Sequence, residues 1–320
     1  MSIPRTVLDI RDLTIRTRTS ATPLVDAVSV RVSAGESVAL VGESGSGKSL
    51  TSLASLRLLP DTLQVRGTIE LDGESVLDMS PQRLREVRGT TAAVIFQEPM
   101  SSLNPVLTVQ TQLYEALRGT PRAGKRAAAL ELLDQVGITD PTRRLRQYPH
   151  ELSGGMSQRI MIAIALAGRP SLLIADEPTT ALDVTIQAQV LELLQRLARE
   201  LDMAVLLVTH DLGIVAENCD RVNVLYAGRI VETGPTDTVF GNPRHPYTRA
   251  LFASIPDVDA APRRLPSLPG TVPTLATMPD GCRFHPRCPL AEARCAVSTP
   301  PLVAHDGGGE GACWMIGAVA

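Results

Sequence analysis

The stretch GESGSGKS, Gly42–Ser49, decides the fold of this chain. It matches the pattern G-x-x-x-x-G-K-[ST] and lies between an apolar run, SVALV at 37–41, and a helical pattern, LTSLASLRLL at 50–59. A strand, a glycine-rich loop and a helix in this order are the context of a P-loop, whose backbone N–H groups surround a phosphate. The alternative is a simple Gly/Ser turn, which this context disfavours. The stretch therefore predicts a nucleotide site in an α/β fold.

The P-loop residues have distinct expected roles in binding a nucleotide. The Lys48 ammonium is expected to contact the β- and γ-phosphates, and the Ser49 hydroxyl to bind Mg²⁺. Glycines let the backbone approach the phosphates closely. The candidate binding residues of the loop are Gly42, Glu43, Ser44, Gly45, Ser46, Gly47, Lys48 and Ser49.

A pair of acidic residues follows a second apolar run, in LLIADEP at 172–178. Asp176, at the end of the expected strand, can hold the metal ion, and Glu177 can polarise the attacking water. A neighbouring Asp and Glu more often form a solvated turn, but four preceding apolar residues and an upstream P-loop favour catalysis. The sequence thus predicts hydrolysis as well as binding.

Up to about residue 250 the pattern is that of an α/β protein with a mostly parallel sheet. Helical faces are expected at Ala129, Leu132, Leu133 and Val136, and along Ile186, Val190, Leu193, Leu194 and Leu197. Short buried strands are expected at 37–41, 92–96, 172–175 and 204–208.

Composition excludes several classes of protein. The net charge of −3 over 320 residues gives no basic field for nucleic acid. The first residues lack the features of a signal peptide, and the longest strongly apolar run, Ile160–Ala167, is too short to span a bilayer. We expect a cytosolic protein, in which clustered cysteines favour a metal or redox site over disulfides.

LSGGM at 152–156, followed by SQRIMIAIAL, resembles the signature motif of ABC transporter ATP-binding subunits. The resemblance implies a P-loop NTPase fold with a RecA-like core, an ABC nucleotide-binding domain at 1–240 and a helical subdomain at about 98–165. It also implies that Ser153, Gly154 and Gly155 contact the ATP bound to a partner subunit. Met156 stands where many relatives have Gln.

Other residues match further motifs of the family. Gln97 resembles the Q-loop glutamine, which senses Mg²⁺ and contacts membrane subunits, and Ala181–Asp183 resembles the D-loop. His210 resembles the switch histidine beside the γ-phosphate, so the implied catalytic set is Glu177, His210 and Gln97. Relatives usually stack adenine on an N-terminal aromatic residue, but no aromatic residue precedes Phe96. Arg16, Thr17 or Arg18 occupies that place, and an arginine can stack on a base.

QEPMSSLNP at 97–105 and NPRHPYTRAL at 242–251 resemble the oligopeptide/dipeptide and related nickel importer subgroup. The resemblance implies two permease subunits, a second nucleotide-binding subunit, which we expect to be a different chain, and an extracytoplasmic solute-binding protein. It places the chain peripherally at the cytoplasmic face of the cell membrane. The alternatives are an importer of another solute such as nickel, a soluble ABC protein acting on nucleic acid or ribosomes, and a mainly regulatory subunit.

The end of the chain contains four of its five cysteines. A proline-rich connector at 241–281 precedes a cysteine-bearing extension at 282–320, which is expected to form a small metal-binding C-terminal domain. Cys219 lies apart, in a helical region, and is expected to be a small buried residue. The candidate ligands are Cys282, Cys288, Cys295 and Cys313.

Two metal groups remain open for these cysteines. Their spacings differ from the close pairs of most zinc sites, whereas a [4Fe-4S] cluster needs only four convergent thiolates. The resemblance also implies a [4Fe-4S] cluster, with zinc, or unliganded thiols, as the alternative. His285 and His305 are reserve ligands. Arg283, Arg287 and Arg294 are expected to offset the cluster's charge.

Overall fold

The structure, a computed structural model, describes residues 5–97, 102–179, 183–254 and 268–316. Its contacts group the chain into two compact units, each made of separate stretches. The first is mainly Leu71–Leu207, and the second consists of Leu8–Arg31, Ser37–Glu70 and Val208–Ala320. The domain boundaries predicted at residues 240 and 281 stay predictions. No helix among the described residues is both long and apolar enough to cross a membrane.

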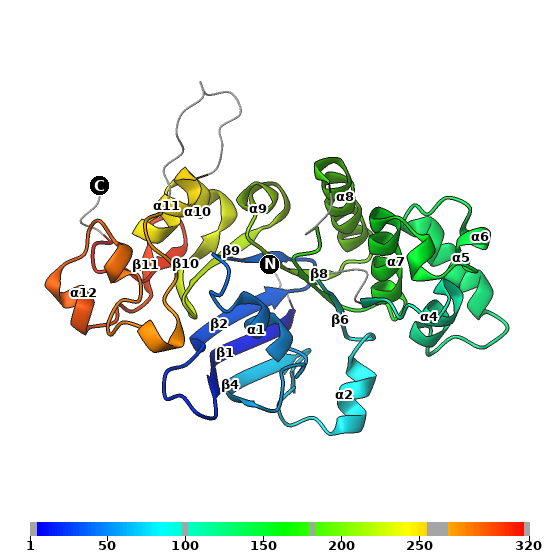
Figure 1. The fold of residues 1–320 in the computed structure, drawn as a ribbon, viewed down its shortest axis with the longest axis horizontal. Helices are drawn as coiled ribbons and strands as arrows, with labels where there is room; N and C mark the ends of the chain where they lie inside the picture. The colour runs from blue at the N-terminus through cyan, green and yellow to red at the C-terminus, as the bar shows by residue number, and fades with distance from the viewer. Residues whose placement is uncertain (1–4, 98–101, 180–182, 255–267, 317–320) are drawn as a thin grey trace. The chain divides into compact units, whose positions relative to one another are not determined.

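The first unit contains a parallel strand pair and most of the long helices. Strand β6 (Ala92–Ile95) pairs in parallel with β7 (Leu172–Asp176), from Ala92 opposite Leu172 to Ile95 opposite Ala175. Helices α4, α5, α6 and α7 lie together in Figure 1, within the range of the predicted helical subdomain. Among its described residues, the helices of this unit are α2 (Pro81–Val87), α4 (Val109–Ala116), α5 (Lys125–Gln135), α6 (Pro141–Arg144), η1 (Pro149–Glu151), α7 (Gly154–Leu166) and α8 (Val184–Glu200).

The predicted apolar faces of two helices are confirmed. Helix α5 buries Ala129, Leu132 and Leu133. In α8, apolar residues at helical spacing are buried, whereas the intervening charged residues are exposed. The buried residues of α8 include Val190, Leu193, Leu194 and Leu197.

The second unit begins with strands that the sequence analysis did not identify. Strands β1 (Thr6–Thr17), β2 (Val25–Ser33) and β4 (Leu63–Leu71) share one sheet in the order β2-β1-β4. In β1, Leu8 and Ile10 are buried at alternate positions, and the alternation resumes one position out of phase at Leu13 and Ile15. Between them Asp12 has a φ of 51°, and an interruption of this kind hides the period of two that marks a strand.

The second sheet segment of this unit combines parallel and antiparallel pairs. Strand β3 (Ser37–Val41) runs parallel to β9 (Arg221–Tyr226). Strand β9 then pairs antiparallel with β10 (Arg229–Pro235), and β12 (Gly309–Gly311) and β11 (Val303–His305) follow with antiparallel pairing. The mostly parallel arrangement expected up to about residue 250 is found at β3–β9 and β6–β7, whereas β10 is antiparallel to β9.

Helices and turns complete the second unit. Strand β8 (Ala204–Thr209) includes the passage from the first unit to the second. The helix α11 lies inside the predicted connector, so the first part of that stretch is helical. The remaining elements are α1 (Lys48–Ala54), α9 (Leu212–Asn218), α10 (Thr236–Gly241), α11 (Pro246–Ala253), η2 (Leu275–Thr277), η3 (His285–Arg287) and α12 (Ala293–Val297).

The C-terminal extension packs into the core of the second unit. Phe284 is 1% exposed, and its ring lies 5.1 Å from that of Tyr226 and 5.4 Å from that of Tyr247. Cys282 and Cys288 pack against the same apolar cluster. The extension therefore contributes side chains to the core of the second unit, and the boundaries predicted for a separate C-terminal element stay predictions.

Candidate nucleotide site

The P-loop joins β3 to α1, and its glycines have the left-handed backbone that such a loop needs. The φ angles are 151° at Gly42, 79° at Gly45 and 101° at Gly47. A Cβ atom on Gly42 would lie 2.1 Å from the carbonyl oxygen of Leu225. No side chain fits there, so the close approach of β9 requires glycine.

Lys48 is held by the loop that precedes it. Its side chain is buried, and its Nζ donates to the carbonyl oxygens of Gly42 (2.8 Å) and Glu43 (3.1 Å). The loop is also fixed from outside, because the Gly228 N–H donates to the Ser46 carbonyl at 2.8 Å. The predicted phosphate lysine is therefore anchored to the loop backbone.

The acidic pair ends strand β7, as predicted. Asp176 is buried at the last position of the strand, and Glu177 has a φ of 47°. This left-handed backbone is uncommon for a residue with a side chain and is typical of functional sites. The Gln97 Nε2 donates to the Glu177 Oε2 at 2.9 Å, so the structure brings together two residues that the sequence placed in separate motifs.

The signature residues begin helix α7. Ser153 is the N-cap, and its hydroxyl accepts a hydrogen bond from the Met156 N–H at 3.3 Å. Gly154 and Gly155 follow in the first turn, where unpaired backbone N–H groups and the helix dipole favour an anion. Downstream, the buried Gln158 donates through its Nε2 to the Pro178 carbonyl at 2.6 Å. This bond connects the helix to the segment after Glu177.

The remaining motif residues lie at the ends of elements. His210 is exposed and follows β8, and Asp211 caps α9 by accepting from the Gly213 N–H at 2.9 Å. Asp183 caps α8, whereas Ala181 and Leu182 of the predicted D-loop lie outside the described residues. The roles assigned to all these residues from their motifs stay predictions.

Two further sets of predicted ligands concern adenine and Mg²⁺. Arg16 and Thr17 lie at the end of β1, and Arg18 follows them, so the place predicted for adenine stacking is a strand end. The predicted Mg²⁺ ligands offer a hydroxyl, an amide and a carboxylate oxygen, which are the hard donors that this ion prefers. They are Ser49, Gln97 and Asp176.

The four C-terminal cysteines lie near one another but do not form a ready metal site. Burial raises the pKa of the Cys282 thiol to about 11, and the charges of the other three cysteines add to this effect. Backbone N–H groups two residues on donate to the sulfurs of Cys282, Cys288 and Cys313, from Phe284, Leu290 and Met315. Among the described residues, however, no group of three or more Cys, His, Asp or Glu is arranged to hold a metal ion.

The predicted metal-binding C-terminal domain is thus not supported by preformed ligand geometry. The expected role of the arginines is wrong for two of them, because the guanidinium groups of Arg283 and Arg287 pair with Asp26 and Glu43. The reserve ligands also have other partners. The His285 Nδ1 lies 2.9 Å from the Cys282 carbonyl oxygen, and the His305 Nδ1 lies 3.0 Å from the Asp306 carbonyl oxygen.

Sequence reasoning missed two contacts to the P-loop. The Tyr247 hydroxyl accepts a hydrogen bond from the Glu43 N–H at 2.9 Å, and the Glu43 carboxylate forms a two-point ion pair with Arg287. Both partners lie more than 200 positions along the chain from Glu43. A single sequence carries no signal for such long-range pairs, although Tyr247 lies within a stretch that marks the subgroup.

Comparison with known proteins agrees with these motifs. Residues 25–180 match the family described as ABC transporter, and residues 231–295 match the one described as oligopeptide/dipeptide transporter, C-terminal region. A peptide import ATP-binding protein of Brucella abortus (strain 2308) is 48% identical over 96% of this chain and 94% of its own. One of Brucella melitensis is 52% identical, over 92% of this chain and 93% of its own.

Two solved structures illustrate the similarity in fold. One is cbiO1 of Clostridium perfringens, part of the ABC transporter complex cbiONQ, with a TM-score of 0.64, 26% identity, and coverage of 74% of this chain and 92% of its own. The other is MJ0796 as a dimer with ADP and Pi, with a TM-score of 0.63, 26% identity, and coverage of 72% and 98%. The chain therefore belongs to the ABC transporter ATP-binding proteins, the ATPase subunits of these transporters.

Proposed function

We propose that this chain powers the import of peptides of the oligopeptide/dipeptide class. The observation that carries the proposal is the extent of its similarity to peptide import ATP-binding proteins, which includes the C-terminal region as well as the ATPase motifs. A general ABC ATPase would need only the ATPase motifs and not the matching C-terminal region. The chain acts at the cytoplasmic face of the membrane, on two permease subunits, in a system with an extracytoplasmic solute-binding protein.

Each motif residue has the role that its chemistry suits. Lys48 and the P-loop N–H groups bind the phosphates, and Ser49, Asp176 and Gln97 supply oxygen ligands for Mg²⁺. When bound, Mg²⁺ neutralises charge on the phosphates. The Glu177 carboxylate orients water, and its hydrogen bond to Gln97 links that carboxylate to the residue that the family uses to contact membrane subunits.

Transport requires a second ATPase subunit, which we take to be a different chain. Ser153, Gly154 and Gly155 of one subunit face the ATP held by Lys48 of the other, with the first turn of α7 directed at its γ-phosphate. ATP then closes the pair and hydrolysis opens it. His210 of each subunit contacts the γ-phosphate, and this contact is lost when the γ-phosphate is cleaved.

The test is ATP hydrolysis by the chain assembled with its permeases, second ATPase and solute-binding protein in vesicles. Unmodified dipeptides and pentapeptides serve as probes, and Ni²⁺ alone is the comparison. The proposal predicts that one peptide class raises the rate and drives its own uptake. Stimulation by Ni²⁺ alone, or by neither probe, would contradict peptide import.

We also propose that Cys282, Cys288, Cys295 and Cys313 bind one metal group, a [4Fe-4S] cluster in preference to zinc. The support is their gathering in one place and the N–H···S hydrogen bonds to three of them, which stabilise thiolates and tune clusters. Because no ready site is present among the described residues, binding must draw the four sulfurs together.

A further inference from the structure

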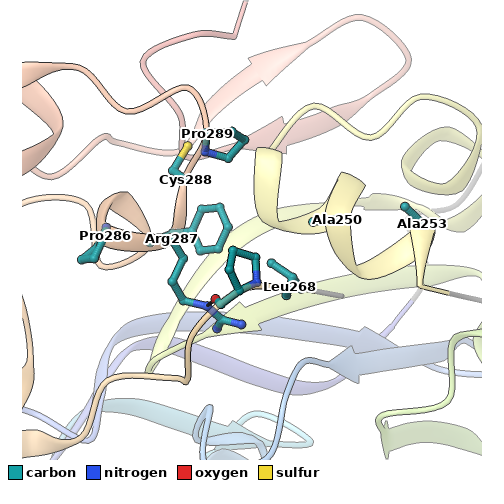
Figure 2. A pocket seen from close by; sticks show the side chains of 9 residues that line it. Ala250, Ala253, Leu268, Pro286, Arg287, Cys288 and Pro289 are labelled. Atoms are coloured by element: carbon teal, nitrogen blue, oxygen red, sulfur yellow. Dashed lines mark hydrogen bonds between the residues drawn. The ribbon is translucent and has the colours of Figure 1, made fainter. Parts of the chain in front are cut away.

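Arg287 of the C-terminal extension contacts the P-loop directly. Its Nη1 donates to the Glu43 Oε1 at 3.0 Å and its Nη2 to the Oε2 at 3.2 Å. The guanidinium is itself fixed, because its Nε donates to the Pro269 carbonyl at 2.8 Å and its Nη1 also lies 3.3 Å from the Tyr226 hydroxyl. The Arg287 side chain is only 6% exposed. It leaves the loop in a different direction from its neighbour Cys288 (Figure 2).

Glu43 also contacts the predicted phosphate lysine, Lys48. Its carboxylate is held by Arg287, its N–H by the Tyr247 hydroxyl at 2.9 Å, and its carbonyl oxygen accepts from the Lys48 Nζ at 3.1 Å. One residue thus joins the extension, helix α11 and the lysine. A shift of Glu43 must shift the carbonyl to which Lys48 is bonded.

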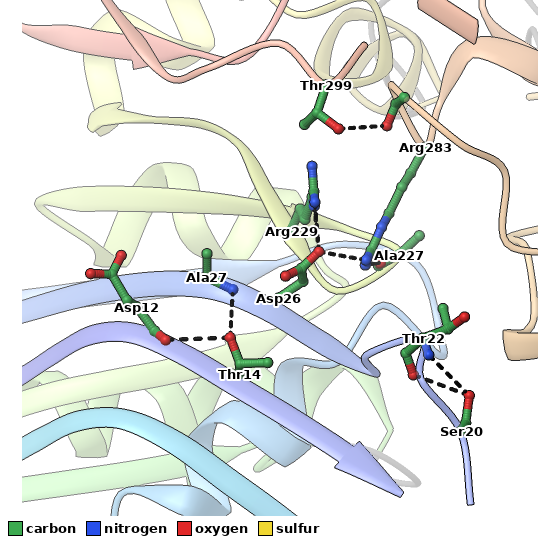
Figure 3. Close-up of polar contacts among 11 residues, drawn as sticks. Asp12, Thr14, Ser20, Thr22, Asp26, Ala27, Ala227, Arg229, Arg283 and Thr299 are labelled. Carbon is green, nitrogen blue, oxygen red and sulfur yellow. Dashed lines mark hydrogen bonds and ion pairs between the residues drawn. The ribbon is translucent and has the colours of Figure 1, made fainter. Parts of the chain in front are cut away.

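A second arginine of the extension reaches the same loop through a turn. The Arg283 Nη2 donates to the Asp26 Oδ2 at 2.7 Å, and its Nη1 donates to the Ala227 carbonyl (Figure 3). The next residue, Gly228, donates its N–H to the Ser46 carbonyl at 2.8 Å. The two arginines therefore support the P-loop at two of its residues, Glu43 and Ser46.

We propose that Arg287 is a positioning residue for ATP, and that through it the C-terminal extension sets the geometry of the P-loop. A guanidinium matches the two oxygens of a carboxylate and holds its orientation, which a lysine ammonium does not. The inference rests on the assignment of Lys48 to the phosphates. It gives the extension a part in nucleotide binding that the ABC motifs alone do not contain.

A purely structural pair would have a different signature. If Arg287 only stabilised the fold, its loss would lower thermal stability in any background and leave the ATP affinity of the folded protein unchanged. If it acts through Glu43, its effect on ATP affinity must vanish once the Glu43 carboxylate is gone.

The experiment is a double-mutant cycle on the full chain, with Glu43→Gln, Arg287→Met and the combined variant. The dissociation constant of a fluorescent ATP analogue is measured with Mg²⁺ by titration, alongside thermal unfolding. We expect each single change to weaken binding about tenfold, the scale of one charge-assisted contact. The combined variant should bind no more weakly than either single one. In the assembled complex the KM for ATP should rise while kcat changes little.

Two controls keep the result interpretable. Arg294→Met removes another arginine of the extension, whose ion pair with Glu292 is half exposed, and it should leave ATP affinity unchanged. Lys48→Ala should abolish most binding, and unchanged binding there would overturn the P-loop assignment itself. With Lys48→Ala behaving as expected, wild-type affinity in both Glu43→Gln and Arg287→Met, or fully additive losses in the combined variant, would overturn the positioning role alone. If Arg287→Met does not fold, Glu43→Gln still tests the same ion pair, because it removes only the charge of the partner carboxylate.

Discussion

At the scale of single residues, His245 connects stability to pH near the nucleotide loop. It is the N-cap of α11, and its imidazole Nδ1 accepts a hydrogen bond from the Tyr247 backbone N–H at 3.0 Å. The backbone N–H of His245 donates to the Glu232 carboxylate at 2.9 Å. Burial lowers the pKa of its imidazole to about 3. Between pH 6.5 and 3 the imidazole is therefore neutral in the folded protein but protonated in the unfolded chain. Its contribution to stability is complete above pH 6.5 and is lost as the pH falls toward 3.

His245→Asn should remove this dependence, because Asn also caps a helix but does not titrate. Between pH 6.5 and 5 the wild-type free energy of unfolding should fall by about 2 kcal/mol more than that of the variant. Urea unfolding at the two pH values measures the difference. His150→Asn, at an exposed position, is the control and should behave like the wild type. An identical pH response in His245→Asn would show that this histidine is not the titrating group.

At the scale of elements, the cysteines near η3 and α12 lead to a prediction about metal content. Protein purified without oxygen should be brown and hold about four iron atoms per chain, as a [4Fe-4S] cluster requires. Cys288→Ser should lose the iron. Cys219→Ser should keep it, because Cys219 caps α9 and is not one of the proposed ligands. Since burial raises the pKa of Cys282 to about 11, binding displaces protons and metal uptake should strengthen as the pH rises.

Iron analysis and colour decide between the outcomes of this experiment. Colourless protein with stoichiometric zinc would overturn the cluster and retain the four-thiolate site. Metal-free protein that remains empty when iron, sulfide or zinc is supplied would overturn both. Iron retained in Cys288→Ser would remove that residue from the ligand set.

The elements also show what a single sequence can and cannot predict. Strands β3, β6, β7 and β8 were predictable because each is a short apolar run, and α1 because it follows the P-loop. Strand β1 was not, because its alternation changes phase at Asp12. Local sequence patterns do not predict contacts between residues that are far apart in the chain. Examples are the pairing of β12 with β10 and the ion pair between Arg287 and Glu43.

At the scale of the whole molecule, the site residues form two sets. The P-loop and His210 belong to the second unit, and the set formed by Gln97, Asp176 and Glu177 belongs to the first, together with the signature residues at the start of α7. The account requires Lys48 and the P-loop backbone to bind ATP and the Glu177 carboxylate to orient the water that hydrolyses it. Binding and hydrolysis should therefore be separable by mutation.

Glu177→Gln in the assembled transporter tests this most directly, with Glu192→Gln, an exposed glutamate on α8, as the matched control. The amide keeps the shape of the side chain and removes the carboxylate that orients water. We predict an ATP dissociation constant close to that of the wild type, and a turnover lower by at least about a hundredfold. Glu192→Gln should match the wild type in both. Wild-type turnover in Glu177→Gln, or an equal loss in Glu192→Gln, would contradict the account.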